Sequence, residues 1–303
     1  IYGSQVGPFK VDIKDGQFYN PVGVAVASDG SVYVAETLGI QKYTSEGVYV
    51  SKWGTQGTGD GEFSWLDSVA VASDGSVYVA DTGNSRIQKF TSEGVYVSQW
   101  GTEGTRDGQF KHPRGVAVAA DGSVYVADTG NHRIQKFTSE GVFITKWAEG
   151  TAGQGNGPHR VAVAADGSVY VADEGNNRIQ KFTSEGVFVS KWGTEGAGDG
   201  QFDWPTDVAV AADGSVYVAD ERNHRIQKFT SEGVFITKWG TEGAGEIGLT
   251  RDLFDGVFHY PRGVAVAADG SVYVADNYPG AVGASGELID WKNGRILKFS
   301  PRP

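Results

Sequence analysis

In the middle of the chain, polar turn residues separate four short apolar runs. These runs are Gly115–Ala119, Val124–Ala127, Ile134–Phe137 and Val142–Trp147. Each run has the length of a β-strand, and the last three are rich in the β-branched and aromatic residues that favour strands. Asp-Gly and Glu-Gly pairs separate the first run from the second and the third from the fourth, which indicates tight hairpin turns. The pattern predicts a four-stranded antiparallel unit joined by hairpins.

This unit recurs six times. An identical block, Asp-Gly-Ser-Val-Tyr-Val-Ala, marks each copy and starts at Asp29, Asp74, Asp121, Asp166, Asp213 and Asp269. A repeat of 45 to 56 residues that contains four strands is typical of a β-propeller with one blade per repeat. We therefore expect an all-β fold, a six-bladed β-propeller of four-stranded antiparallel blades, with residues 1–303 forming a single domain.

A polar motif accompanies the third strand of four units. Arg86-Ile-Gln-Lys-Phe90 is repeated at Arg133, Arg178 and Arg225, and in each copy its Arg ends an Asn-x-Arg sequence. Together with Val-Tyr-Val-Ala-Asp, these residues resemble the NHL-repeat family along essentially the whole chain. The resemblance implies a six-bladed propeller. It leaves function open, since NHL-like propellers include peptide amidating lyases, RNA- or protein-binding domains of TRIM-type regulators, and extracellular sensors of bacterial receptor kinases.

The two ends of the chain bear on how the ring closes. The sixth copy stops at Phe299, before a fourth strand. We predict that the segment Ile1–Val11 supplies this outer strand, because closing the last blade with strands from both termini removes open sheet edges. The chain contains no methionine, so we expect that Ile1 is not a native start and that the chain is a processed product, a fragment or a trimmed form.

Strand direction divides the turns between two faces. The tight hairpins lie on one face, here called the bottom face, and the other loops lie on the top face. The bottom face carries the first Asp of each block and a glutamate in five copies, namely Glu46, Glu93, Glu140, Glu185 and Glu232. Because every copy is alike, we interpret these carboxylates as turn chemistry and solubility rather than as a cation site.

The copies differ on the top face, just before each first strand. The position expected to point toward the axis holds Val22, Asp67, Arg114, His159, Thr206 and Arg262. Strands copied almost verbatim beside one diversified face favour a functional site on that face, with neutral loop drift as the alternative. The predicted binding residues are Trp65, Asp67, His112, Arg114, His159, Arg160, Trp204, Tyr260, Arg262 and Trp291.

Two long loops open on the top face in the sixth copy. Gly240–Gly263 is nine residues longer than its counterparts, and Asp276–Arg295 is 14 residues longer. The second loop contains Leu288-Ile-Asp-Trp291, enough apolar surface to fold back onto the protein. We predict that it caps part of the axial mouth; the alternative is that it covers only the seam where the ring closes.

Two further groups of polar residues resemble catalytic sites: a repeated Asp-Asn-Arg trio and the histidines near the mouth. The trio Asp81, Asn84 and Arg86 recurs in most copies, and we interpret it as a structural network. The amidating lyases bind zinc through histidines that each follow a proline at the start of an inner strand. Only His159 has this placement here, so the resemblance does not carry the zinc site over, although a pair of His159 and Asp67 could act across the mouth.

Composition narrows the function classes. The net charge of −11 argues against general affinity for nucleic acid, and the absence of cysteine excludes disulfides and thiolate metal sites. It also suits an extracellular or cell-surface setting. We expect a monomeric, non-catalytic binding scaffold without a cofactor and without a membrane partner. Its top-face loops and axial mouth would bind a protein, peptide, glycan or small anionic ligand. The alternatives are a metal-dependent lyase or hydrolase and a purely structural repeat module, natural or partly designed.

Overall fold

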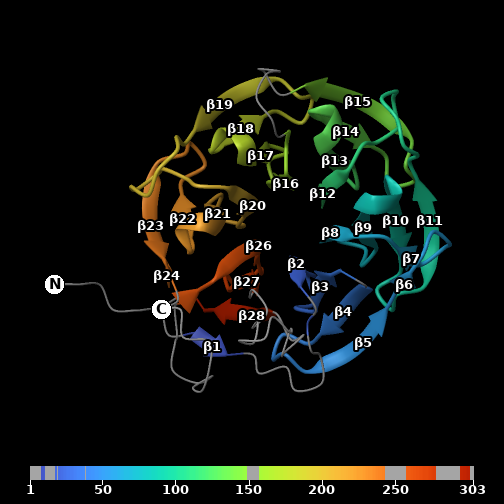
Figure 1. Cartoon of the computed structure of the whole chain (residues 1–303), viewed down its shortest axis with the longest axis horizontal. Helices are drawn as coiled ribbons and strands as arrows, with labels where there is room; N and C mark the ends of the chain where they lie inside the picture. Colours follow the sequence, from blue (N-terminus) through green and yellow to red (C-terminus); the bar gives the residue numbers. More distant parts are fainter. Residues whose placement is uncertain are drawn as a thin grey trace, which may run out of the picture.

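The computed structural model describes residues 8–10, 18, 20–37, 39–148, 157–242, 257–277 and 294–300. These residues form six four-stranded antiparallel sheets arranged as a ring, with the first strand of each repeat innermost (Figure 1). The predicted all-β, six-bladed propeller is therefore confirmed. No helix in the described part of the chain is long and apolar enough to cross a membrane.

The strand bounds follow the repeat. The first blade contains β2 (Pro21–Val26), β3 (Val32–Glu36), β4 (Gly39–Tyr43) and β5 (Tyr49–Trp53). The second contains β8 (Leu66–Val71), β9 (Val77–Asp81), β10 (Arg86–Phe90) and β11 (Tyr96–Trp100). The third contains β12 (Pro113–Val118), β13 (Val124–Asp128), β14 (Arg133–Phe137) and β15 (Phe143–Ala148).

The remaining blades repeat this order. The fourth contains β16 (Arg160–Val163), β17 (Val169–Asp173), β18 (Arg178–Phe182) and β19 (Phe188–Trp192). The fifth contains β20 (Pro205–Val210), β21 (Val216–Asp220), β22 (Arg225–Phe229) and β23 (Phe235–Trp239). The sixth contains β26 (Tyr260–Val266), β27 (Val272–Asn277), β28 (Gly294–Phe299) and β1 (Pro8–Lys10). Short 3₁₀ turns join second and third strands: η1 (Thr82–Asn84), η2 (Thr129–Asn131), η3 (Glu174–Asn176) and η4 (Glu221–Asn223).

The ring closes as predicted. Strand β1 pairs antiparallel with β28, with Pro8 opposite Phe299 and Lys10 opposite Leu297. The last blade thus combines both ends of the chain, and the third strand of that blade is not left as an edge.

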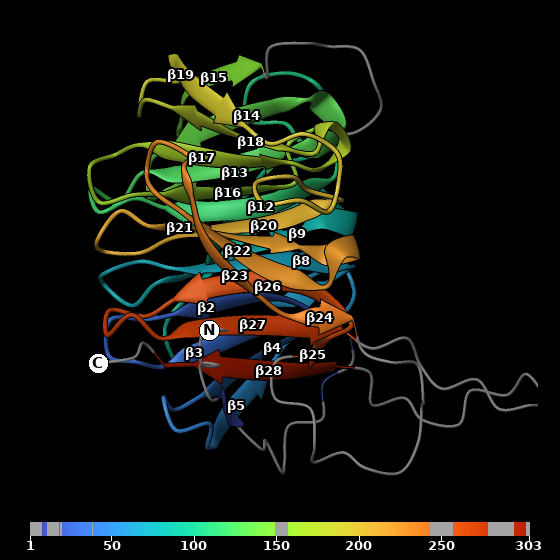
Figure 2. The same ribbon diagram turned by 90° about the vertical axis from the view of Figure 1, so that its left-hand side faces the viewer.

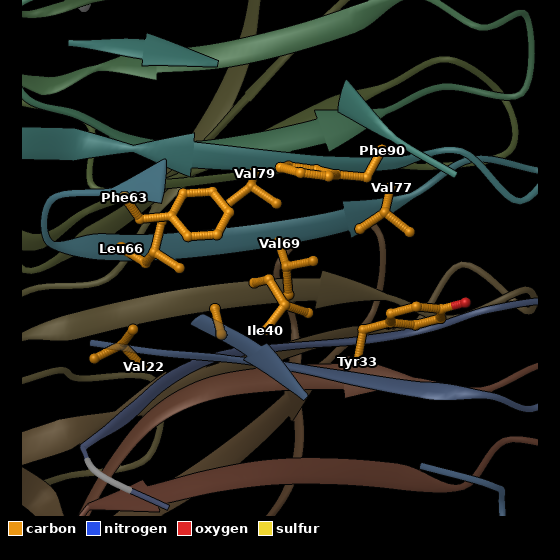
Figure 3. Close-up of a cluster of buried hydrophobic side chains, with 10 residues drawn as sticks. Val22, Tyr33, Ile40, Phe63, Leu66, Val69, Val77, Val79 and Phe90 are labelled. Atoms are coloured by element: carbon orange, nitrogen blue, oxygen red, sulfur yellow. The ribbon is translucent and has the colours of Figure 1, made fainter. Parts of the chain in front are cut away.

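The hydrophobic core lies between neighbouring blades. In the cluster shared by the first two blades, Val22, Tyr33 and Ile40 face Leu66 and Phe90 (Figure 3). An outer-strand tryptophan extends five of the six such clusters of the described residues. The Trp53 ring, for example, lies 6.1 Å from Tyr33 of its own blade and 6.1 Å from Phe90 of the next. Since the same side chains recur, one packing solution serves nearly every blade interface.

The carboxylates of the bottom face stabilise their own turns. Asp74 accepts a 2.8 Å hydrogen bond from the backbone N–H of Ser76, and Ser92 donates a hydrogen bond to Glu93. The bond from Ser76 lowers the pKa of the Asp74 carboxyl, and the equivalent aspartates behave alike. These bonds support the interpretation as turn chemistry.

The polar trio forms a structural network. Arg86 Nε donates to Asp81 Oδ2 at 2.7 Å, and Asn84 donates to the same carboxylate. The Arg86 guanidinium also donates to the carbonyls of Gly59 and Glu62, which ties the third strand to the incoming loop. Equivalent bonds recur around Arg133 and Arg225, so the network belongs to the frame of the molecule.

Candidate functional site

The two faces of the ring can be followed edge-on in Figure 2. At the top face, the axis is closed by Arg160 of β16, whose side chain is only 3% exposed. Its guanidinium donates hydrogen bonds to the carbonyl oxygens of Val22, Asp67 and Arg114, which belong to the first, second and third blades. Sequence reasoning placed Arg160 among ligand-binding residues of the mouth; the structure places it across the axis, with both terminal nitrogens bonded to backbone carbonyls.

Asp207 extends this bridge to the other blades. Its Oδ1 lies 4.0 Å from Arg160 Nε, and its carboxylate accepts hydrogen bonds from the backbone N–H groups of Val208 and Val264. Through these contacts, side chains of the fourth and fifth blades reach the backbone of the remaining four. Burial raises the pKa of Asp207 to about 6, although the charge of Arg160 opposes the shift.

His159 is held on both of its ring nitrogens. Nδ1 lies 2.8 Å from the carbonyl oxygen of Thr206, and Nε2 lies 3.2 Å from Glu174 Oε2. A carbonyl oxygen only accepts, so we assign the proton to Nδ1, which leaves a lone pair on Nε2 facing the carboxyl group. The contact with Glu174 therefore requires one shared proton.

The surroundings favour a neutral form of this pair. Burial, reinforced by the positive charge of Arg160 and Arg114, holds the pKa of His159 well below its usual range. Burial also raises the pKa of Glu174. We infer that a protonated Glu174 donates to His159 Nε2. The expected pair of His159 and Asp67 is not formed, because Asp67 instead faces Arg114, with 4.0 Å between Oδ2 and Nε.

A cleft of about 180 Å³ opens beside His159, between the third and fourth blades. Its side-chain lining comprises His112, Arg114, Thr129, His132, His159 and Glu174. The volume exceeds the roughly 30 Å³ share of one water molecule, so several waters or a small chemical group fit. The structure thus gathers three predicted residues, His112, Arg114 and His159, around one cavity.

Aromatic side chains surround the mouth in an unusual backbone conformation. Trp65, His112 and Trp204 have φ values of 57°, 51° and 60°, in the left-handed region that bulky residues avoid. Trp65 is 66% exposed, whereas Trp204 lies under the guanidinium of Arg222, 3.5 Å from the ring centroid. Tyr260 packs on His224, with 5.7 Å between the ring centroids.

The other predicted residues have defined places. Arg262 Nε lies 3.3 Å from Glu221 Oε1. Val22 and Thr206 are buried at the top-face ends of β2 and β20. Trp291 lies outside the described residues, as do most of the two long loops of the sixth blade.

Sequence reasoning missed Glu174, which contacts His159, and Glu221, which contacts Arg262. Both follow the last Asp of the second strand, where two earlier copies have Thr82 and Thr129. Those threonines donate to the carbonyls of Pro113 and Pro158 in the next blade. The change from Thr to Glu between copies was a readable signal of the same kind as the diversified triplets.

The histidines do not form a metal centre. Within the described ranges, no group of three or more His, Asp or Glu residues is placed to hold a metal ion. The contacts described around the cleft are hydrogen bonds, ion pairs and the shared proton of His159 and Glu174.

The sequence of this chain also matches a known repeat family. The NHL repeat pattern matches residues 63–90, 110–137, 156–182, 202–229 and 258–284, each beginning before the first strand of a blade. The chain belongs to the NHL-repeat family. No curated protein matches it in sequence.

Solved structures resemble this NHL propeller at low identity. A streptogramin B lyase shares 14% identity and a TM-score of 0.62, over 98% of this chain and 100% of that one. A gluconolactonase from Xanthomonas campestris shares 10% identity and a TM-score of 0.66, over 97% and 89%. A structure of a nidogen/laminin complex shares 16% identity and a TM-score of 0.57, over 72% and 79%. At these identities the likeness shows the fold alone.

Proposed function

We propose that this NHL propeller is a binding module whose top-face mouth takes a peptide, glycan or protein segment. The observation that carries the proposal is Trp65, a large aromatic residue that is 66% exposed at a left-handed backbone position. A non-glycine residue in this region costs about 1 to 3 kcal/mol. The equivalent residues Asn20, His112 and Trp204 share the conformation, so what distinguishes Trp65 is its large exposed ring. Stability alone gives no reason for a tryptophan there.

The surroundings of Trp65 support ligand binding. Exposed tryptophan and arginine side chains are the usual anchors of interfaces, and Arg114 and Arg262 lie in the same mouth. Both arginines are partly exposed, at 43% and 40% of their side chains. The repeated strands supply a rigid frame on which these residues are held. A propeller in a nidogen/laminin complex fits a protein partner as one form of the ligand.

The test uses Trp65→Gly, because glycine adopts the left-handed conformation without strain. The wild-type protein is screened on peptide and glycan arrays, and hits are measured by calorimetry. We expect Trp65→Gly to weaken binding at least tenfold while the protein stays folded. Val95→Ser, at an exposed position of the bottom-face hairpin turn of the second blade, is the matched control and should bind normally. Unchanged binding by Trp65→Gly would overturn the placement of the site.

Catalysis is the second candidate, favoured by the contact of His159 with Glu174 beside an open cleft. A buried pair that shares a proton is suited to general acid–base chemistry. The gluconolactonase of similar fold suggests lactones as trial substrates. Turnover of a lactone by the wild-type protein that is lost in Glu174→Gln would replace the binding module with an enzyme. Equal rates in both proteins would remove this candidate.

A further inference from the structure

We propose that the cleft between the third and fourth blades binds a small anionic group, a carboxylate or a phosphate, on the guanidinium of Arg114. This inference rests on the proposed function of the top-face mouth and names the chemistry of the group that the mouth recognises.

The guanidinium of Arg114 has N–H donors that form no hydrogen bond within the described residues. Its Nε is buried and has no hydrogen-bond partner among the described residues, and Asp67 Oδ2 at 4.0 Å is beyond hydrogen-bonding distance. Arg160 Nε also lacks a hydrogen-bond partner, but the two terminal nitrogens of Arg160 donate to three carbonyls, and Arg262 lies within 3.3 Å of Glu221. A guanidinium with an unused fork of donors is matched to the two oxygens of a carboxylate or phosphate.

The cleft exists because the fourth copy has a glycine at one rim position. Gly157 stands where the other copies carry Asn20, Trp65, His112, Trp204 and Tyr260. A Cβ atom there would lie 2.4 Å from the carbonyl oxygen of Thr129 and 3.0 Å from His132 Nδ1. The missing side chain thus lets His132 approach and leaves space in front of Arg114.

The charge balance of the lining favours an anion. Arg114 and three histidines face a single carboxyl group, that of Glu174, whose pKa is raised by burial. When protonated, Glu174 donates to His159 and does not repel an anion. The charges of Arg160 and Arg262 also reach the cleft, since both act on His159. In a partly desolvated cavity these positive charges act more strongly than at the open surface.

Calorimetric titration with inorganic phosphate and with acetate, at low ionic strength, tests the inference. We expect the wild-type protein to bind at least one of the two anions and Arg114→Gln to lose at least tenfold in affinity. Arg222→Gln removes the same charge from the same face outside the cleft, and we expect it to bind as the wild type does. Melting curves of each variant check that it is folded.

Glu174→Gln tests the protonated form of this side chain. Gln keeps a donor toward His159 and is neutral like the protonated carboxyl group, so we expect anion affinity within about twofold of the wild type. The ring signals of His112 and His132 in NMR spectra, assigned with single His→Asn variants, should shift on titration. Absence of binding by the wild type, unchanged affinity in Arg114→Gln, or weaker binding in Glu174→Gln would each overturn the inference.

These results are separable from the function proposed above. Trp65 does not line the cleft, so Trp65→Gly should bind phosphate or acetate as the wild type does. Peptide or glycan binding without anion binding would refute only the anion site. Anion binding without any larger ligand would leave the anion site in place and refute the binding module.

Discussion

The bottom and top faces use the same kinds of side chain for opposite purposes. On the bottom face, Asp74 and Glu93 form hydrogen bonds within their own turns, and every copy repeats the arrangement. On the top face, His159 and Glu174 contact each other, and Arg160 and Asp207 link different blades, in contacts that occur once. The difference teaches that a local, repeated contact supports the frame, whereas an unrepeated contact across blades marks the place where the protein is specialised.

The largest expected effect tests whether Arg160 pins the ring. Arg160→Met removes a buried guanidinium and leaves Asp207 and three carbonyls without it. Breaking a buried pair typically costs about 3 to 5 kcal/mol of the free energy of unfolding. Urea denaturation measures this loss. Arg222→Met, exposed on the same face, should cost less than about 1 kcal/mol; equal losses in both variants would contradict the pinning role.

The second-largest expected effect is a difference between the two faces in how their aspartates make the free energy of unfolding depend on pH. The pKa of Asp207 is about 6 in the folded protein, against 3.8 as the ordinary value. The folded state therefore retains a proton that the unfolded chain has released. Stability from this group is present below about pH 4 and lost as the pH rises through 6, by up to about 3 kcal/mol. The aspartates of the bottom face have lowered pKa values. Their contribution to the free energy of unfolding is therefore present at neutral pH and lost on acidification.

Asp207→Asn is the control for that window. The difference in free energy of unfolding between the wild type and Asp207→Asn should change between pH 4 and pH 7. A difference that stays constant across this range would show that Asp207 ionises normally.

A smaller effect concerns the repeated frame of the bottom face. Gly94 has φ of 83°, and an added Cβ would lie 2.5 Å from the ring of Trp53. Gly108 on the top face has φ of 75° but no atom within 4 Å of such a Cβ. Alanine at either position costs similar backbone strain, so the difference isolates the tryptophan contact. We expect Gly94→Ala to lose about 1 to 3 kcal/mol more than Gly108→Ala in urea denaturation.

The smallest expected effect returns to the rim. Trp65→Gly relieves left-handed strain but adds entropy to the unfolded chain, so its free energy of unfolding should lie within about 1 kcal/mol of the wild type. A decrease of more than about 2 kcal/mol in the free energy of unfolding would mean that Trp65 stabilises the fold, which would contradict its role as a ligand-binding residue.

The sequence by itself determined the frame. Six identical Asp-Gly-Ser-Val-Tyr-Val-Ala blocks, hairpin turns and alternating apolar runs depend on local residue preferences, which are readable along the chain. They predicted the blades, the two faces and the pairing of β1 with β28. The diversified triplets pointed to the top face, where His112, Arg114 and His159 line one cleft.

Only the tertiary structure decided which top-face residues remain available. Arg160 and Arg114 look alike in sequence, and each has a buried Nε without a partner. The terminal nitrogens of Arg160 donate to carbonyls from three blades, whereas the side chain of Arg114 is 43% exposed beside the cleft. The partner of His159 proved to be Glu174 rather than Asp67. Gly157 opens a cleft only because η2 of the neighbouring blade lies against it. The physical reason is common to all three: closing the ring brings residues of different repeats together, and their distances depend on packing that no single repeat encodes.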